Sequence, residues 1–128
     1  MWEIGIYSAI APFGLLVLAS VWQYPAVLEE VVKWLLLRSL MIDRRSWISA
    51  GFVVGGVFGL SEAMLFTTNA WMSGDWQAIG IRLLLTVPMH TLTAMLIAWS
   101  MKYKISYLGL VGAMVIHAIF NYLVLLIA

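Results

Sequence analysis

The sequence has no cysteine and little charge. Of its 128 residues 10% are charged and 64% are hydrophobic, whereas an ordinary globular domain is roughly 45–50% apolar. A soluble domain of this size leaves about a third of its unfolded surface in water, and the charges here are too few to cover that surface. The composition therefore excludes a soluble enzyme. The lack of cysteine excludes a disulfide scaffold, a cysteine-based zinc site and thiol catalysis.

The charges that are present form no basic stripe. The net charge is +1, and it arises from scattered residues. Nucleic-acid binding requires a clustered positive surface, so we expect no nucleic-acid partner. The expected surrounding medium is the lipid bilayer.

Long apolar runs dominate the chain. Residues 4–22, 47–68, 83–101 and 105–128 contain one charged residue between them, Glu62. Each run can cross a hydrocarbon core of roughly 30 Å as a helix. A fifth segment, residues 25–42, is apolar except for Glu29, Glu30, Lys33 and Arg38. We predict an all-α, polytopic membrane helix bundle with about five transmembrane helices, forming a single domain over residues 1–128.

The distribution of basic residues predicts the orientation. If all five segments cross, the connections 42–46 and 101–105 lie on one side and contain Arg44, Arg45, Lys102 and Lys104. The connections on the other side, which include a predicted loop over residues 71–78, contain only Asp75. Basic connections stay in the cytoplasm. We therefore expect a cytoplasmic N-terminus and an external C-terminus.

Several polar residues lie inside these apolar runs. Ionisable groups in a membrane span are costly and usually face a bundle interior or a water-filled cavity. Counted from the predicted outer ends, Glu29 and Glu30 lie about 8 Å deep and His90 and His117 roughly 16 Å deep. Four helices would thus bring polar groups to one layer, which indicates a single shared site. The set is Glu29, Glu30, Lys33, Glu62, Arg82, His90, His117 and Asn121.

Structural explanations exist for some of these residues. Lys33 lies four residues after Glu29, so the two can form an intrahelical ion pair that helps a marginal helix to insert. Arg82 can extend toward the outer interface. The glycines at positions 51, 55, 56 and 59 favour close helix packing in lipid. Two histidines at matched depth beside three glutamates are harder to explain by packing alone.

The residue types suit two hydrolytic mechanisms. In one, His90, His117 and a glutamate bind a zinc ion that keeps an open position for water. In the other, no metal is needed: a buried glutamate takes a proton from water, and histidine and asparagine side chains donate hydrogen bonds to the developing oxyanion. The residues alone leave both mechanisms open.

Four short motifs resemble those of the PrsW family of intramembrane proteases, within the CAAX protease and CPBP superfamily. Residues 29–33 match its EExxK motif, residues 58–62 are similar to its FxxxE motif, Arg82 with residues 90–94 resembles its third motif, and residues 117–121 resemble its HxxxN-like motif. They occur in order on successive predicted helices. The resemblance covers a protease-like core over about residues 25–124.

The resemblance implies hydrolysis of a peptide bond in a membrane protein or lipidated peptide, in a prokaryotic plasma membrane. It implies Glu29 as the water-activating base with Glu30 as its support. His117 and Asn121 would stabilise the oxyanion, and His90 would orient or bind water or metal. A metal site would consist of His90, His117 and Glu62, with zinc as the cofactor, or no cofactor would be needed. Because family members are commonly longer, we expect a homo-oligomer to supply missing walls.

Two other classes of function fit the same residues. A catalytically silent scaffold or bacteriocin-immunity-type protein of the superfamily would use them as a structural hydrogen-bond network. A small transporter or proton relay would also place Glu, Lys and His at mid-depth, but it usually has inverted repeats, and none is evident in the sequence.

Overall fold

The computed structural model describes residues 2–19, 24–39, 46–74 and 76–127, apart from some side chains within these ranges. These residues form five helices and no strand. The prediction of an all-α helix bundle is confirmed. The helices are α1 (Trp2–Ala19), α2 (Pro25–Ser39), α3 (Trp47–Ser73), α4 (Trp76–Lys102) and α5 (Ser106–Ile127).

Three of the helices are long and apolar enough to cross a membrane. Their apolar stretches are Trp47–Thr68 in α3, Ile79–Lys102 in α4 and Ser106–Val124 in α5. Helix α1 contains a shorter apolar stretch, Gly5–Leu15. Helix α2 has 15 residues, about 22 Å at 1.5 Å per residue, which is less than the thickness of a hydrocarbon core. Membrane crossing by α1 and α2, and the orientation that depends on it, stay predictions.

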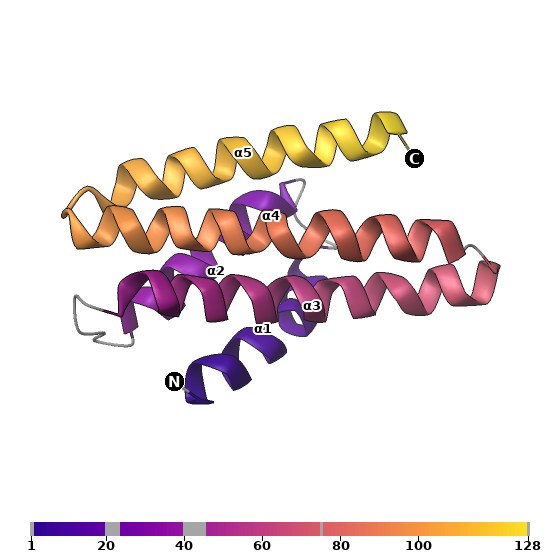
Figure 1. Ribbon diagram of the computed structural model, residues 1–128, viewed down its shortest axis with the longest axis horizontal. Helices are drawn as coiled ribbons and strands as arrows, with labels where there is room; N and C mark the ends of the chain where they lie inside the picture. The colour runs from indigo at the N-terminus through magenta and orange to yellow at the C-terminus, as the bar shows by residue number, and fades with distance from the viewer. Residues whose placement is uncertain (1, 20–23, 40–45, 75, 128) are drawn as a thin grey trace.

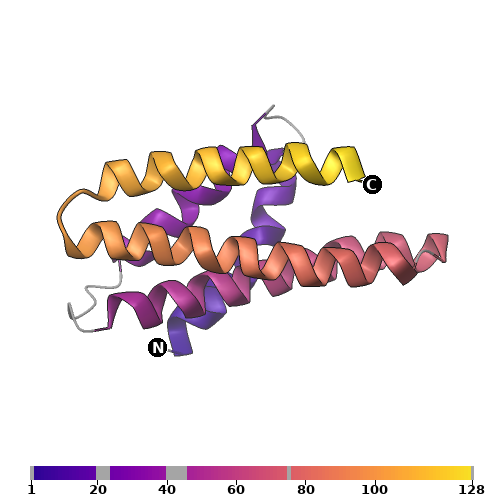
Figure 2. The same cartoon turned by 45° about the horizontal axis from the view of Figure 1, so that its top comes forward.

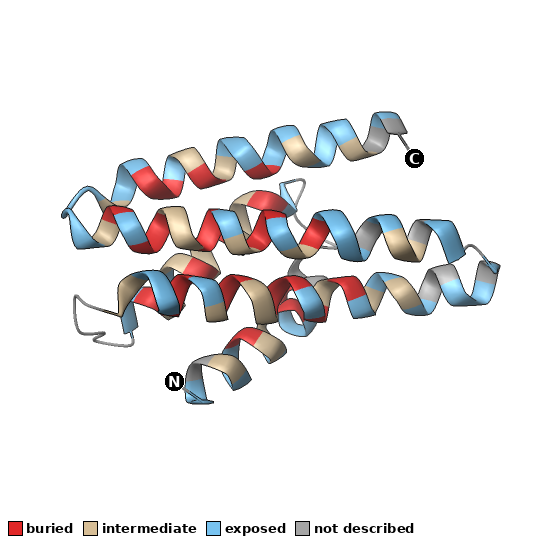
Figure 3. Cartoon of the chain, viewed as in Figure 1, coloured by how far each residue is buried: buried red, intermediate tan, exposed pale blue. Residues whose placement is uncertain are grey.

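The long helices lie side by side, with α4 between α3 and α5, and α1 and α2 cross them obliquely (Figures 1 and 2). Helix α2 contacts α3, α4 and α5, while α1 contacts α2 and α3. Helix α2 begins part-way along α3 and α4, whose far ends extend well beyond it. Buried positions accordingly gather in the part of the bundle that α1 and α2 cover (Figure 3).

Glycines bring α3 and α4 into close contact. A Cβ atom on Gly51 would lie 2.8 Å from Met95 Cα, one on Gly59 would lie 2.9 Å from Val87 Cα, and one on Gly55 would overlap the His90 carbonyl group. No other residue type fits this seam without moving a backbone. The packing interpretation of these glycines is supported, and Glu62, one turn after Gly59, is thereby held next to α4.

An apolar core lies where α2, α3, α4 and α5 meet. We use "apolar core" for the buried cluster of Leu37, Ala50, Val54, Ala94, Ile97, Ala98, Leu110 and Ala113. Half of its members are alanines, which let the helices approach closely without a large hydrophobic driving force in lipid. Trp34 and Trp47 pack against its edge.

The predicted loop over residues 71–78 is wrong. Helix α3 continues to Ser73 and α4 already begins at Trp76. Gly74 has a φ of 74°, a conformation that glycine adopts at little cost, and its N–H donates to the Trp71 carbonyl at 3.1 Å. Hydropathy marks where an apolar run stops, but a helix can continue through polar and aromatic residues at the interface. Asp75 lies outside the described residues.

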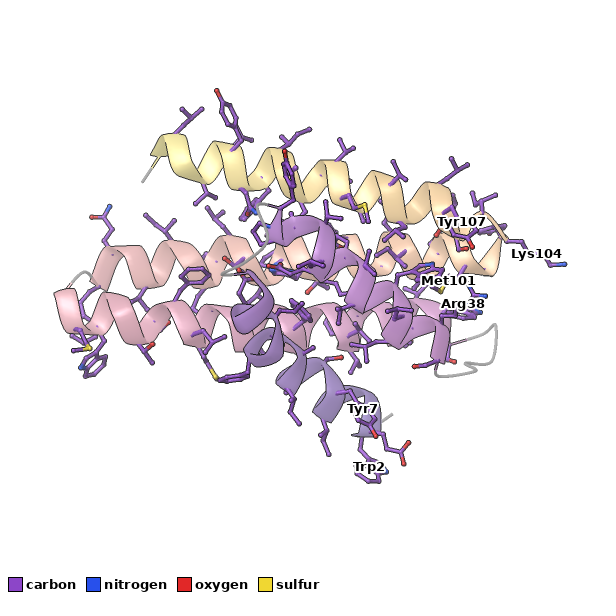
Figure 4. All side chains as sticks on the ribbon, turned by 180° about the vertical axis from the view of Figure 1, so that it is seen from behind. Trp2, Tyr7, Arg38, Met101, Lys104 and Tyr107 are labelled. Atoms are coloured by element: carbon purple, nitrogen blue, oxygen red, sulfur yellow. The ribbon has the colours of Figure 1, made fainter. Side chains whose placement is uncertain are left out.

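Basic residues gather at the end of the bundle near the α4–α5 connection. Arg38, from α2, and Lys104, from the α4–α5 connection, lie at this end together with Met101 and Tyr107 (Figure 4). The Arg38 guanidinium lies 5.0 Å from the Trp34 ring centre. Arg44 and Arg45 lie outside the described residues. The described part of the pattern agrees with a cytoplasmic location of this end.

Candidate functional site

Four helices bring five of the six predicted catalytic residues into one cluster. Glu29 and Glu30 come from α2, Glu62 from α3, His90 from α4 and His117 from α5. The cluster borders the apolar core near the middle of the long helices. Because α2 begins part-way along the bundle (Figure 2), its first turns lie level with the two histidines. Glu29 and Glu30 therefore lie at the level of the histidines within the bundle, and their depth in the membrane stays a prediction.

Glu30 is the anchor of the cluster. Its Oε1 atom lies 2.6 Å from Lys33 Nζ and 2.7 Å from His117 Nδ1, and the side chains of Glu30 and Lys33 are fully buried. Lys33 therefore pairs with Glu30, three residues before it, rather than with Glu29 as the spacing of four suggested. Both spacings put the side chains on one helix face, and the neighbouring helices decide between them.

Thr93 is a member of the cluster to which sequence reasoning assigned no role. Its side chain is fully buried. Lys33 Nζ donates to Thr93 Oγ1 at 3.0 Å, and Thr93 Oγ1 lies 3.3 Å from Glu30 Oε1 and 3.2 Å from the His90 carbonyl oxygen. The sequence signals for Thr93 were its place within residues 90–94 and its position three residues after His90, on the same helix face.

Glu29, His90 and His117 form a group with the geometry of metal ligands. One carboxylate oxygen and one nitrogen of each ring all lie within 4.8 Å of one another. Glu29 Oε2 lies 3.5 Å from His117 Nε2 and 3.9 Å from His90 Nε2, and the two rings are nearly perpendicular, with centres 4.9 Å apart. Ligand atoms about 2.0–2.2 Å from a zinc ion lie roughly 3–4 Å from each other.

The donor set fits zinc. Two imidazoles and one carboxylate are the ligands of known His₂Glu hydrolytic sites. Glu29 Oε2 is buried and has no hydrogen-bond partner among the described residues, which is costly for a carboxylate unless another group binds it. Glu30 behind His117 is the carboxylate partner that metal-binding histidines usually have on their second nitrogen.

Glu62 approaches the cluster from the α3 side and contacts His90 Nε2. Its side chain is 19% exposed and that of Glu29 is 15% exposed, whereas His90 and His117 are almost completely buried. The two carboxylates therefore mark the accessible side of the cluster.

His90 is held differently from His117. Its Nδ1 atom is buried without a hydrogen-bond partner in the described part of the chain. Its ring centre lies 5.2 Å from that of Phe58, and the Lys33 ammonium lies 5.2 Å from the same Phe58 ring. His117 is oriented by a hydrogen bond to Glu30. The His90 ring instead packs against the rings of Phe58 and His117.

The structure does not bring Asn121 into the cluster. Asn121 is exposed and makes no hydrogen bond to the other described site residues. It lies one turn beyond His117, about 6 Å along the helix, toward the end of α5 that α2 does not cover (Figures 1 and 2). The side chain of Arg82 lies outside the described part of the structure.

The fold and this cluster define a polytopic membrane protein with a buried Glu–His–His centre, a class suited to hydrolysis within the membrane. The family model of PrsW family intramembrane metalloproteases matches residues 4–128. The chain therefore belongs to this family, and it is an integral membrane protein. No curated protein and no solved structure matches the chain.

Proposed function

We propose that this protein is a zinc-dependent endopeptidase of a prokaryotic plasma membrane, which hydrolyses a peptide bond of a membrane protein or lipidated peptide. Membership of a family of intramembrane metalloproteases supports the reaction class. The observation that carries the assignment to particular residues is the convergence of Glu29, His90 and His117 from three helices, with their ligand atoms within 4.8 Å of one another.

We assign Glu29 as the carboxylate ligand because it faces both histidines, although Glu62 makes the closer contact with His90. Glu29 Oε2 lies within 4 Å of both histidine Nε2 atoms, as a shared ion requires. Glu62 contacts His90 Nε2 from the α3 side. In this proposal Glu29 is the metal ligand and Glu62 is the base, which reverses the roles that the family resemblance implied for them.

Glu29, His90 and His117 would hold the zinc ion, which would supply a nucleophile at neutral pH by lowering the pKa of water. Glu62 then serves as the general base. It takes one proton from the water as the oxygen adds to the scissile carbonyl carbon, and it returns that proton to the amide nitrogen as the C–N bond breaks. Its partial exposure beside His90 suits a group that must reach both water and substrate.

Asn121 keeps a place in the proposal as a donor to the substrate. Asn121 is exposed one turn beyond His117, where its side-chain N–H groups can donate hydrogen bonds to carbonyl oxygens of a bound peptide. Donors aimed at a developing oxyanion contribute strongly to such reactions. A homo-oligomer that completes the walls around this surface is a further part of the proposal.

The test measures zinc content and peptide cleavage on the same samples of protein in liposomes. Wild type, Glu29→Gln and Glu62→Gln are compared on a panel of single-pass transmembrane peptides. We expect Glu29→Gln to lose both zinc and cleavage. We expect Glu62→Gln to keep its zinc while its turnover falls about 10²–10⁴-fold, the range for loss of a general base.

Glu3→Gln is the matched control, since Glu3 is exposed at the start of α1. Full activity in metal-free wild type would instead support a glutamate mechanism without metal. Absence of cleavage of every peptide by zinc-loaded wild type would favour the silent scaffold.

A further inference from the structure

The Thr93 hydroxyl group on α4 contacts both charged residues of the Lys33–Glu30 pair on α2. It accepts a hydrogen bond from Lys33 Nζ on α2, and it can donate either to Glu30 Oε1 or to the His90 carbonyl oxygen. Since a hydroxyl group has one proton, it donates to one of these acceptors at a time. Either choice leaves α4 connected with α2, because the bond from Lys33 is kept.

The contacts of Glu30 determine which nitrogen of His117 carries the proton. The carboxylate lies against the Lys33 ammonium at 2.6 Å, so it accepts rather than donates. His117 Nδ1, at 2.7 Å from the same oxygen, must then be the donor. With Nδ1 as the donor, a neutral ring presents a lone pair on Nε2, which is the nitrogen that faces Glu29.

Lys33 has few polar contacts to hold it in this position. Its side chain is fully buried, and its described contacts are Glu30, Thr93 and the face of Phe58. An ammonium group has three protons to share. Without the Thr93 oxygen, only Glu30 would remain as a described hydrogen-bond acceptor, and the ion pair could move away from His117.

We propose that Thr93 is a positioning residue, which holds the Lys33–Glu30 pair in the place where Glu30 keeps His117 in its Nδ1–H tautomer. This inference deepens the proposed function and rests on it for the consequence in zinc binding. Thr93 itself touches neither Glu29 nor the ring nitrogens in the described contacts, so it acts through Glu30.

The decisive comparison is Thr93→Val against Thr93→Ser. Valine has nearly the shape of threonine but no hydroxyl group, and serine keeps the hydroxyl group. Thr91→Val is the matched control, because Thr91 lies on the same helix and, among the described contacts, its hydroxyl donates to the Val87 carbonyl at 2.7 Å. Circular dichroism and gel filtration in detergent verify that each variant is folded.

The first measurement is ¹⁵N NMR of the imidazole rings in the metal-free protein. The chain has two histidines, and a His90→Gln sample assigns the signals. We expect one Nδ1–H tautomer for His117 in wild type, Thr93→Ser and Thr91→Val, and a mixture of tautomers in Thr93→Val. This readout depends on neither zinc nor cleavage, so it tests the positioning role even where the proposed function fails.

The second measurement is zinc affinity by competition with a chelator. We expect Thr93→Val to bind zinc about 10–100-fold more weakly, the usual effect of losing an outer-shell partner, with the loss in cleavage residing in kcat rather than KM. Thr93→Ser should restore both values. If Thr93→Val does not fold, Thr93→Ala takes its place in the NMR comparison. A single Nδ1–H tautomer in the hydroxyl-free variant, or equal defects in the valine and serine variants, overturns the proposal.

Discussion

The apolar core and the polar cluster are neighbours in one bundle, yet they are held together in different ways. The core consists of alanines and larger aliphatic residues that fill space between closely spaced helices. In the polar cluster Glu30, Lys33, Thr93 and His117 are equally buried, but they are held by directed contacts with one another. The first region tolerates any group of the right shape, and the second requires particular atoms.

The difference indicates how the molecule divides stability from chemistry. Between helices in lipid, the hydrophobic effect contributes little and close packing contributes more, so small residues and the α3–α4 glycine seam hold the frame. A buried charge is tolerated only when its partner and hydrogen bonds are in place. Changes in the core should therefore lower stability alone, whereas changes in the cluster should affect stability and function together.

The largest effect on stability is expected from Lys33→Met, which removes the charge that faces Glu30. A buried carboxylate without its partner destabilises a protein by about 3–5 kcal/mol. The free energy of unfolding in mixed micelles measures this, and zinc binding should fall in parallel. Lys102→Met is the control, because Lys102 is exposed at the end of α4. A Lys33→Met protein as stable as wild type would remove the distinction between the two regions.

A smaller effect, limited to stability, is expected from Leu37→Ala in the apolar core. Leu37 is fully buried, and truncation of a buried leucine costs about 2–5 kcal/mol. Zinc affinity and cleavage per folded molecule should stay at wild-type values, because Leu37 makes no described contact with the cluster. The comparison with exposed Leu35→Ala, two residues earlier on α2, controls for loss of helix propensity. Weakened zinc binding in Leu37→Ala would show that core and cluster are coupled.

The smallest effect on stability is expected from Gly55→Ala, which tests whether the seam connects the two regions. The added methyl group meets the backbone of His90 and Thr91, and overpacking of this kind costs about 1–3 kcal/mol. Since α3 must move away from α4, the contact between Glu62 and His90 should loosen and cleavage should fall. Gly80→Ala is the control, because nothing lies within 4 Å of its added Cβ atom. Unchanged cleavage in Gly55→Ala would mean that the seam does not position Glu62.

Some residues of the site could be predicted because ionisable side chains are conspicuous in the apolar sequence of a membrane span. Glu62, His90 and His117 stand out from apolar surroundings, and burial of such groups requires a shared polar environment. Thr93 is not conspicuous in this way, since a threonine hydroxyl inside a membrane helix can bond to the backbone of its own helix. Asn121 was grouped with His117 by a spacing of four residues, but helix spacing does not reveal how far α2 covers α5.

The sequence by itself determined the membrane environment, the helices and the polar residues that must share one site, because these follow from hydropathy and from the cost of isolated charges in lipid. Only the tertiary structure decided that Lys33 pairs with Glu30, that Glu29 faces both histidines, and that Glu62 reaches His90 from α3. Those outcomes depend on the oblique course of α2 and on the close approach of α3 to α4. The sequence pattern allows several pairings of these side chains equally well. A shift of one residue along a helix, or of a few ångströms between helices, decides which pairing forms.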